Sequence, residues 1–123
     1  MLDENTRKIF KAKVFAHLAL CDGGVPHTSP VWVDVTDDDR ILFNTAEGRV
    51  KARLLAEGTM VALSATNPDN PYEMAFVRGR VTGRRHENAD ADIDALAKKY
   101  LDEDTYPFRQ EGEVRVTVLV EPE

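Results

Sequence analysis

Short apolar segments separated by turn-forming residues limit the fold of this chain more than any other feature of its sequence. The turn signals include Asp22–Gly24, Asp37–Asp39 and a proline-containing loop at 67–71. Connections of hairpin length favour antiparallel pairing, because parallel strands need long crossovers. We therefore expect mainly β structure with helices at its edges, in the form of a six-stranded antiparallel barrel, closed or half closed. The six expected strands are residues 14–21, 28–36, 40–44, 60–66, 73–87 and 114–120.

The sequence predicts further features of two of these strands. The segment 28–36 is expected to pair with 40–44, because only a short acidic turn separates them. The segment 73–87 is unusually long, which predicts a curled strand. Its Gly79 and Gly83 mark positions where a strand bends or where a ligand approaches the backbone.

Three further segments have the features of helices. Residues 3–13 predict a short helix, and residues 48–57 predict another that ends before Gly58, a typical helix terminator. Asn88 is placed to cap a third helix. The apolar residues of this third helix recur at i, i+3, i+4, i+7 and i+8: Ile93, Leu96, Ala97, Tyr100 and Leu101.

Length and charge exclude several classes of protein. The 123 residues fit a single domain, residues 1–123, and no apolar run approaches the roughly 20 residues that span a bilayer. The N-terminus lacks the apolar region of a secretory signal, and one cysteine cannot form an internal disulfide. The net charge of −6 argues against general binding to nucleic acid or anionic membranes. We expect a cytoplasmic protein.

The familiar catalytic and metal-binding patterns are missing. Cys21 lies in an apolar run, so a buried structural thiol is favoured over a nucleophile. The histidines His17, His27 and His86 are scattered and have no cysteine or carboxylate at ligand spacing, so we expect no metal site. Neither a P-loop nor a GxGxxG run is present.

The stretch FNTAEGRVKAR, residues 43–53, is the strongest candidate site. It places Arg49, Lys51 and Arg53 at the start of an expected helix, where free N–H groups favour an anion. Arginine and lysine suit a phosphorylated cofactor, and Asn44 and Thr45 offer neutral donors. A solvated helix face is the more common explanation for such a motif in isolation. Without an anion, however, cations at a helix start are unfavourable.

Four segments together carry a resemblance to a known family: HTSPVWVDV, ILFNTAEGRVKARLL, ALSATNPDNPYEMAFVRGRV and KKYLDEDTYPFRQEGEVRVTVLVEPE. In this order and spacing they resemble the actinobacterial deazaflavin-dependent oxidoreductases of the pyridoxamine 5'-phosphate oxidase-like, FMN-binding split-barrel superfamily. The resemblance covers nearly the whole chain. It implies a homodimeric split β-barrel that binds a flavin or deazaflavin in a groove at the subunit interface.

The resemblance also implies roles for individual residues. Residues that match the strand beside the cofactor ring are Ser29, Pro30, Val31 and Trp32, and residues that match the phosphate-binding segment are Asn44, Thr45, Arg49 and Lys51. Arg53 lies one helical step farther along the same segment. Tyr72, Tyr106 and Phe108 are candidates for a substrate pocket, the last two because YPFR resembles the family's segment near the groove. Phe76 is a further candidate, for which core packing is an equal explanation.

The implied activity is hydride transfer from reduced coenzyme F-420 to a small, electron-poor organic substrate, with no catalytic side chain identified. Pyridoxamine phosphate oxidation is not expected, because the Arg-led ring strand and the C-terminal Trp and Arg of those oxidases are missing. Pro30 also removes a backbone donor at the ring strand. The alternatives are an FMN-dependent enzyme on the same fold, a non-catalytic flavin or deazaflavin carrier, and a structural module that binds no cofactor.

The sequence also favours one cofactor over the other. Coenzyme F-420 carries a phosphodiester and an acidic tail, so it presents negative charge over a longer path than FMN. The cations expected to hold this tail are Arg49, Lys51 and Arg53 with Arg78, Arg80, Arg84 and Arg85, of which the last two are also explained by a solvated strand. We expect F-420 to bind at least about tenfold more tightly than FMN, a difference of about 1.4 kcal/mol.

Overall fold

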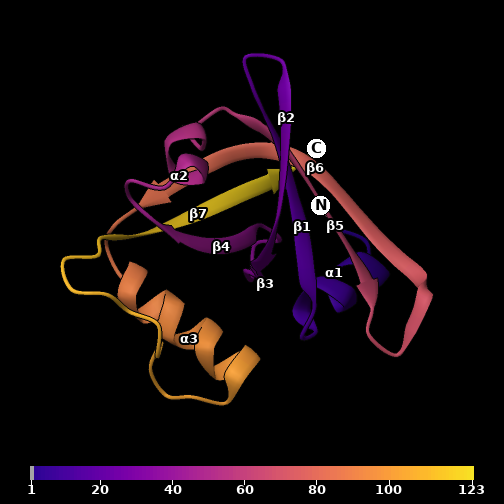
Figure 1. Cartoon of the computed structure of the whole chain (residues 1–123). Helices are drawn as coiled ribbons and strands as arrows, with labels where there is room; N and C mark the ends of the chain where they lie inside the picture. Colours follow the sequence, from indigo (N-terminus) through magenta and orange to yellow (C-terminus); the bar gives the residue numbers. More distant parts are fainter. Residues whose placement is uncertain (1) are drawn as a thin grey trace.

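A computed structural model describes residues 2–123 and shows one antiparallel sheet that curls into a half-barrel (Figure 1). The strands lie in the order β2-β1-β5-β6-β7-β4-β3. The prediction of a mainly β, half-closed antiparallel fold is confirmed. The elements are α1 (Glu4–Lys11), β1 (Phe15–Asp22), β2 (Val25–Trp32), β3 (Asp34–Val35), β4 (Ile41–Ala46), α2 (Val50–Leu54), β5 (Met60–Asn67), β6 (Asn70–Arg85), α3 (Ala89–Leu101) and β7 (Arg115–Pro122).

The structure has seven strands where the sequence predicted six, because the expected strand 28–36 is divided at Val33. The Val33 N–H donates to the Tyr100 hydroxyl at 3.0 Å, and its carbonyl accepts from Lys99. These bonds to α3 remove Val33 from the sheet ladder. As a result β2 pairs with β1, and only the two-residue β3 makes the predicted pairing with the 40–44 segment.

The core lies inside the curl of the sheet. Alternate residues of β1 face inward, with Ala16, Leu18 and Leu20 buried. On α1, the side chain of Asp3 caps the helix by accepting from the Thr6 N–H at 2.8 Å, and Ile9 and Phe10 are buried on the opposite face. Each such large side chain stabilises the fold by roughly 1.5–3 kcal/mol through burial.

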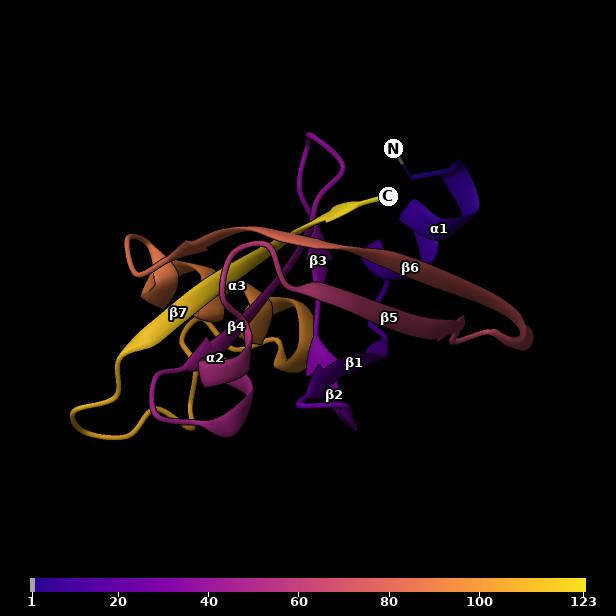
Figure 2. The same ribbon diagram turned by 90° about the horizontal axis from the view of Figure 1, so that it is seen from above.

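The long strand β6 joins the two parts of the sheet. Its first part pairs with β5 and its second part with β7, as the view from above shows (Figure 2). Gly79 lies where the two pairings overlap, opposite both Val61 and Pro122. A Cβ at this position would stand 2.1 Å from the Glu121 carbonyl oxygen, so only glycine permits the approach of β7. A neighbouring strand, rather than a ligand, thus approaches the backbone at Gly79.

α1 contributes Ile9 and Phe10 to the core inside the curl, whereas α3 covers β7 and β4 from the other face. α3 lies against β7 and β4, while α1 lies against β6, β5 and β3 (Figure 1). The two ends of the described chain lie near each other in both views (Figures 1 and 2). Among residues 2–123, no helix has the length and apolar character needed to cross a membrane.

Four local predictions are wrong or need correction. Cys21 is exposed rather than buried, because the inward positions of β1 are its even-numbered residues. Asn88 precedes α3 as predicted but has a left-handed backbone and makes no side-chain cap. The predicted helix 48–57 is reduced to α2, five residues long. The predicted loop at 67–71 is mostly strand, because β5 ends at Asn67 and β6 begins at Asn70.

Candidate functional site

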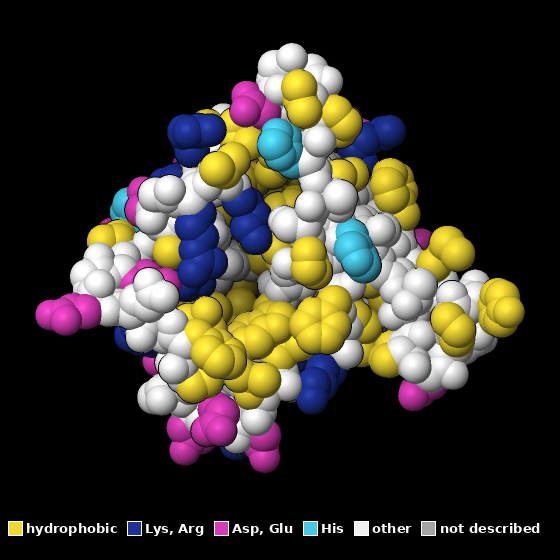
Figure 3. All heavy atoms as spheres, in the orientation of Figure 1, with side chains coloured by type: hydrophobic (Ala, Val, Ile, Leu, Met, Phe, Trp, Pro, Cys, Tyr) yellow, Lys and Arg dark blue, Asp and Glu magenta, His cyan; other side chains and the backbone are white. Residues whose placement is uncertain are grey.

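A cavity of about 190 Å³ lies between β2, α2, α3 and the loop before β7. The corresponding face of the molecule is hollowed, with Lys and Arg side chains on one side of the hollow and hydrophobic side chains along another (Figure 3). Eight residues singled out from the sequence line this cavity: Pro30, Val31, Trp32, Asn44, Arg49, Lys51, Tyr106 and Phe108. Three more residues line it that the sequence had not suggested as site residues: Ile93, Leu96 and Arg115.

A second cavity, of about 200 Å³, adjoins the first at Lys51, which lines both. Its walls are largely apolar, with polar side chains from β2. Ser29, predicted as a ring contact, lies here rather than beside Trp32. The lining residues are Leu18, Leu20, His27, Thr28, Ser29, Val50, Lys51 and Leu54. Together the two cavities follow β2 along most of its length.

Three cations gather at the first cavity with a single nearby carboxylate. Arg115 Nη1 lies 2.9 Å from Glu113 Oε1, and Arg49 Nη2 lies 3.5 Å from the same oxygen. Lys51 makes no hydrogen bond or ion pair within residues 2–123. The cluster of Arg49, Lys51, Arg115 and Glu113, called here the cationic cluster, therefore carries an excess of two positive charges.

The surroundings of Lys51 agree with this excess of positive charge. Partial burial lowers the pKa of the Lys51 ammonium from its ordinary value of 10.5, and the neighbouring Arg49 and Arg115 lower it further. Both effects disfavour the charged form of Lys51. The negative charge of a bound anion would oppose both effects and favour the charged form of Lys51.

Arg115 is the most deeply buried member of the cationic cluster, at 4% exposed. Its Nε donates to Asn44 Oδ1 at 2.8 Å, while Asn44 Nδ2 donates to the Ala89 carbonyl at 3.0 Å and to Thr117 Oγ1 at 3.2 Å. The amide of Asn44 is thus fully engaged and holds Arg115 in place. Nη2 of Arg115 has no partner within the part of the chain that the structure describes, so it is available to a ligand in the cavity.

The position of Arg115 explains why sequence reasoning missed it. β7 is buried on both faces, by the core on one side and by α3 with the following loop on the other. The expected strand 114–120 was treated only as an apolar strand. The signal was present, however, because an arginine within VRVTVLV must be paired or functional if the strand is buried.

Aromatic side chains form the opposite wall. Trp32 stacks on Tyr100, with ring centroids 5.1 Å apart, and meets the edge of Tyr106 at 6.0 Å. Tyr106 also makes an edge contact with Phe108, with ring centroids 5.7 Å apart. The guanidinium carbon of Arg115 lies over the Tyr106 ring, 5.1 Å from its centroid. The loop that carries Tyr106 and Phe108 is fixed to α3, because the Tyr106 N–H donates to Asp94 at 2.8 Å.

Four candidates from the sequence lie elsewhere. Thr45 is fully buried on the core side of β4, because neighbouring strand residues point to opposite faces and Asn44 occupies the other one. Its Oγ1 has no hydrogen-bond partner among residues 2–123. Arg53 is exposed and lines neither cavity. Tyr72 and Phe76 are 91% and 63% exposed on β6, so Phe76 is in neither the core nor the cationic cavity.

The arginines of β6 do not extend the cationic cluster. Arg78 pairs with Glu123 and Arg80 donates to the Gly58 carbonyl. Arg84 pairs with Glu47, and Arg85 pairs with Asp92. None of the four lines either cavity. The expectation that they hold an acidic cofactor tail is not supported by their positions.

The N-terminus of α2 attracts an anion less strongly than the sequence predicted. α2 has only five residues, and Arg49 occupies its N-cap position without a side-chain cap. A helix this short has a small dipole. The anion-binding character of the site thus comes from side chains on α2 and β7.

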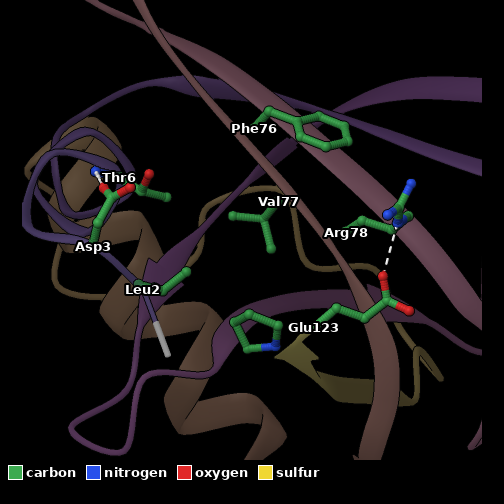
Figure 4. A pocket seen from close by; sticks show the side chains of 8 residues that line it. Leu2, Asp3, Thr6, Phe76, Val77, Arg78 and Glu123 are labelled. Atoms are coloured by element: carbon green, nitrogen blue, oxygen red, sulfur yellow. Dashed lines mark hydrogen bonds and ion pairs between the residues drawn. The ribbon is translucent and has the colours of Figure 1, made fainter.

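A third cavity, of about 210 Å³, lies near the two ends of the chain (Figure 4). Arg78 faces Glu123 across 2.9 Å, and Asp3 accepts from the N–H of Thr6. The cation of this cavity is therefore already paired, and the Asp3 carboxylate is bonded to the backbone of its own helix. This cavity is as large as the other two but shows no unpaired charge that points to a ligand.

The geometry suits a ligand with a planar ring and an anionic tail. Apolar and aromatic walls favour the ring, and the cationic cluster favours phosphate oxygens. Among residues 2–123, no three His, Cys, Asp or Glu side chains gather in a way that holds a metal ion.

Comparisons with known proteins agree with this description of the site. A family model described as pyridoxamine 5'-phosphate oxidase matches residues 2–123. A solved structure named F420 Reductase shares 27% identity with a TM-score of 0.84, over 99% of this chain and 96% of that one. The FAD binding protein from Mycobacterium smegmatis shares 20% identity with a TM-score of 0.64, over 99% and 91% of the two chains. The FAD and heme binding protein from the same organism shares 19% identity with a TM-score of 0.65, over 96% and 64%. The last two show the fold alone. No curated protein matches the sequence.

Proposed function

The chain belongs to the pyridoxamine 5'-phosphate oxidase family, and we propose that it is an oxidoreductase that uses reduced coenzyme F-420 to reduce a small, electron-poor organic substrate. The observation that carries this proposal is the uncompensated cationic cluster beside an aromatic wall. The similarity to a structure named F420 Reductase supports the choice of cofactor.

The residues of the site fit such a cofactor. Arg49, Lys51 and Arg115 would hold the phosphate, because they supply mobile and forked donors with an excess of positive charge. Trp32 and Tyr106 would border the ring. When bound, the reduced deazaflavin supplies the hydride.

The chain itself contributes binding and orientation. The stacked pair of Trp32 and Tyr100 fixes one wall, and the bond between Asp94 and the Tyr106 N–H fixes the other. Apolar residues of α3, Ile93 and Leu96, exclude water from the base of the cavity. Within the cavity the Tyr106 hydroxyl is the one neutral acid, so a proton required by the product comes from this hydroxyl or from solvent.

We further propose a homodimer with the cofactor at its interface. The cavities are smaller than the roughly 300 Å³ or more of a typical ligand site, so one chain supplies only part of the enclosure. Large apolar side chains are exposed on the outer face of the sheet, including Phe15 at 61%, Met74 at 67% and Phe76 at 63%. A second copy that covers this face would shield them.

Light scattering of the purified protein with cofactor tests the dimer. We expect a dimer at micromolar concentration, because obligate interfaces of this kind bury about 2,000 Å² or more. A monomer that retains the cofactor contradicts the proposal.

Titration and turnover test the function. Purified protein should quench or enhance the fluorescence of F-420 saturably, and should oxidise the reduced cofactor in the presence of a panel of enones and quinones. Binding without accelerated oxidation indicates a carrier. Binding of FMN at equal or greater affinity indicates an FMN-dependent enzyme on the same fold, and no binding of either cofactor contradicts the proposal.

A further inference from the structure

Glu113 is the single carboxylate of the cationic cluster, and nothing in the sequence motifs assigns it a role. Its side chain is only 8% exposed. One oxygen, Oε1, faces both Arg115 at 2.9 Å and Arg49 at 3.5 Å, and the other accepts weakly from the Gln110 N–H at 3.4 Å. Glu113 thus lies behind the two arginines that line the cavity.

This position has an electrostatic consequence for any anion in the cavity. An anion held by Arg49 and Arg115 shares those donors with the Glu113 carboxylate. The repulsion between Glu113 and the anion is weakly screened, because the carboxylate is almost fully buried. Its magnitude scales with the charge of the anion. A doubly charged phosphate therefore loses twice as much free energy to Glu113 as a singly charged one.

The two candidate cofactors differ in this respect. FMN ends in a phosphate monoester, which carries close to two negative charges at neutral pH. The phosphodiester of coenzyme F-420 carries one. The arginines of β6 lie outside the cavities, so this difference in phosphate charge acts at the cationic cluster.

We propose that Glu113 is a specificity-determining residue that makes the site select a phosphodiester over a phosphate monoester. The proposal rests on the proposed function, because it needs a phosphorylated flavin or deazaflavin in the cationic cavity. Glu113 acts through Arg49 and Arg115 and lowers the charge that they present from three to two units, counted with Lys51. It is a positioning and charge-setting residue and takes no part in the reaction.

The test uses the charge-removing variant Glu113→Gln in the full-length protein, with dissociation constants measured for three compounds. Riboflavin has no phosphate and should bind this variant and the unaltered protein equally. F-420 should bind about threefold more tightly to the variant, and FMN about tenfold more tightly, because a doubly charged group squares the fold-change of a singly charged one. The measured preference for F-420 therefore falls by about threefold.

Glu111→Gln is the matched control. Glu111 is on the same loop, is exposed and has no ion pair within residues 2–123, so removal of its charge should leave the ratio of the two affinities unchanged. A second variant, Glu113→Asp, retains the charge but withdraws it by one methylene from the arginines. The preference for F-420 over FMN should fall in this variant as well, by a smaller factor. If Glu113→Gln does not fold, the measurement on Glu113→Asp tests the inference.

The outcomes separate this inference from the proposed function. Equal fold-changes for FMN and F-420, or weaker binding of both, show that Glu113 only supports the structure and overturn the inference while the proposed function stands. Absence of saturable binding of either cofactor to the unaltered protein overturns both. A loss of F-420 preference confined to the Glu113 variants supports the inference.

Discussion

Two cavities of nearly equal volume, about 190 and 210 Å³, differ in how their charged side chains are paired. In the cavity near the chain ends, Arg78 is the one lining cation among the described residues and pairs with Glu123, while Asp3 accepts from the backbone of α1. In the cationic cavity, Arg49 and Arg115 share one carboxylate and Lys51 has no partner within residues 2–123.

The pairing of charge, rather than the volume, therefore separates these two cavities. Surface ion pairs such as that of Arg78 contribute about 0–1 kcal/mol and need no further explanation. A half-buried lysine beside two arginines is unfavourable for the free protein and becomes favourable once an anion is bound. The following predictions test this distinction, from the largest expected effect to the smallest.

The largest difference is expected between the two arginines. Arg115→Met should lower the free energy of unfolding by about 3 kcal/mol, because it leaves Glu113 buried with only the longer contact to Arg49. Arg78→Met should change it by less than about 1 kcal/mol. Urea denaturation of both variants measures the effect. Equal losses of unfolding free energy in the two variants would show that burial of the Arg115–Glu113 pair does not affect stability.

The next effect concerns cofactor affinity. Arg49→Ala and Lys51→Ala should each weaken cofactor binding by about 1.5–3 kcal/mol, the range for charge-assisted hydrogen bonds. Folding should remain nearly intact. Arg53→Ala is the matched control and should do less, since Arg53 lines neither cavity. If thermal stability falls sharply while affinity does not change, the cations form a structural feature instead.

A smaller effect is expected at the aromatic wall. Tyr106→Leu should weaken cofactor binding by about 1 kcal/mol, because it removes the edge contact to Trp32 and the ring beneath Arg115. Tyr72→Leu, at the exposed end of β6, should weaken binding less, because Tyr72 lines neither cavity. Calorimetric titration compares them. A larger loss for Tyr72→Leu would place Tyr72 of a second copy over the cofactor.

The smallest effect is a pH dependence. The pKa of Lys51 lies below 10.5, so in the free site this lysine loses its proton at a lower pH than an ordinary lysine. Cofactor affinity should therefore decline by less than about tenfold as the pH rises from about 7 towards 10. The unfolding free energy should rise over the upper part of this window, because the unfolded chain then binds more protons.

Lys51→Arg is the control for this dependence. Arginine keeps its charge throughout the range, so the part of the decline that belongs to residue 51 should disappear. Any ionisation of the cofactor affects both proteins equally and cancels in the comparison. Parallel pH profiles would show that Lys51 does not titrate in this range.

The sequence predicted those parts of the fold that depend on local patterns. β1 and β5 follow from the alternation of apolar residues, and α3 follows from its periodicity. The division of the expected strand at Val33 was not predictable, because it depends on bonds from Lys99 and Tyr100, more than sixty residues away. Contacts this distant leave no periodic signal near the residue that they affect.

The site shows the same limit. Arg49 and Lys51 were recognised because they are close together in the sequence. Arg115 and Glu113 join them only through the pairing of β4 with β7, which brings residue 46 opposite residue 115. Thr45 lies on the core face of β4, opposite to Asn44, so its side chain does not line the cavity. The sequence motif indicated the end of β4 that borders the cavity. It did not indicate that Arg115 of β7 lies beside that end.

The place of β7 in the sheet has a consequence for biosynthesis. Among the strands of residues 2–123, β7 is translated after all the others, yet it lies between β6 and β4 and carries Arg115. Until residues 115–122 leave the ribosome, β4 and β6 each present an unpaired strand edge, and the pairing across more than seventy residues cannot form. The nascent chain is therefore exposed to aggregation until β7 inserts, and the cationic cluster gains Arg115 only at that step.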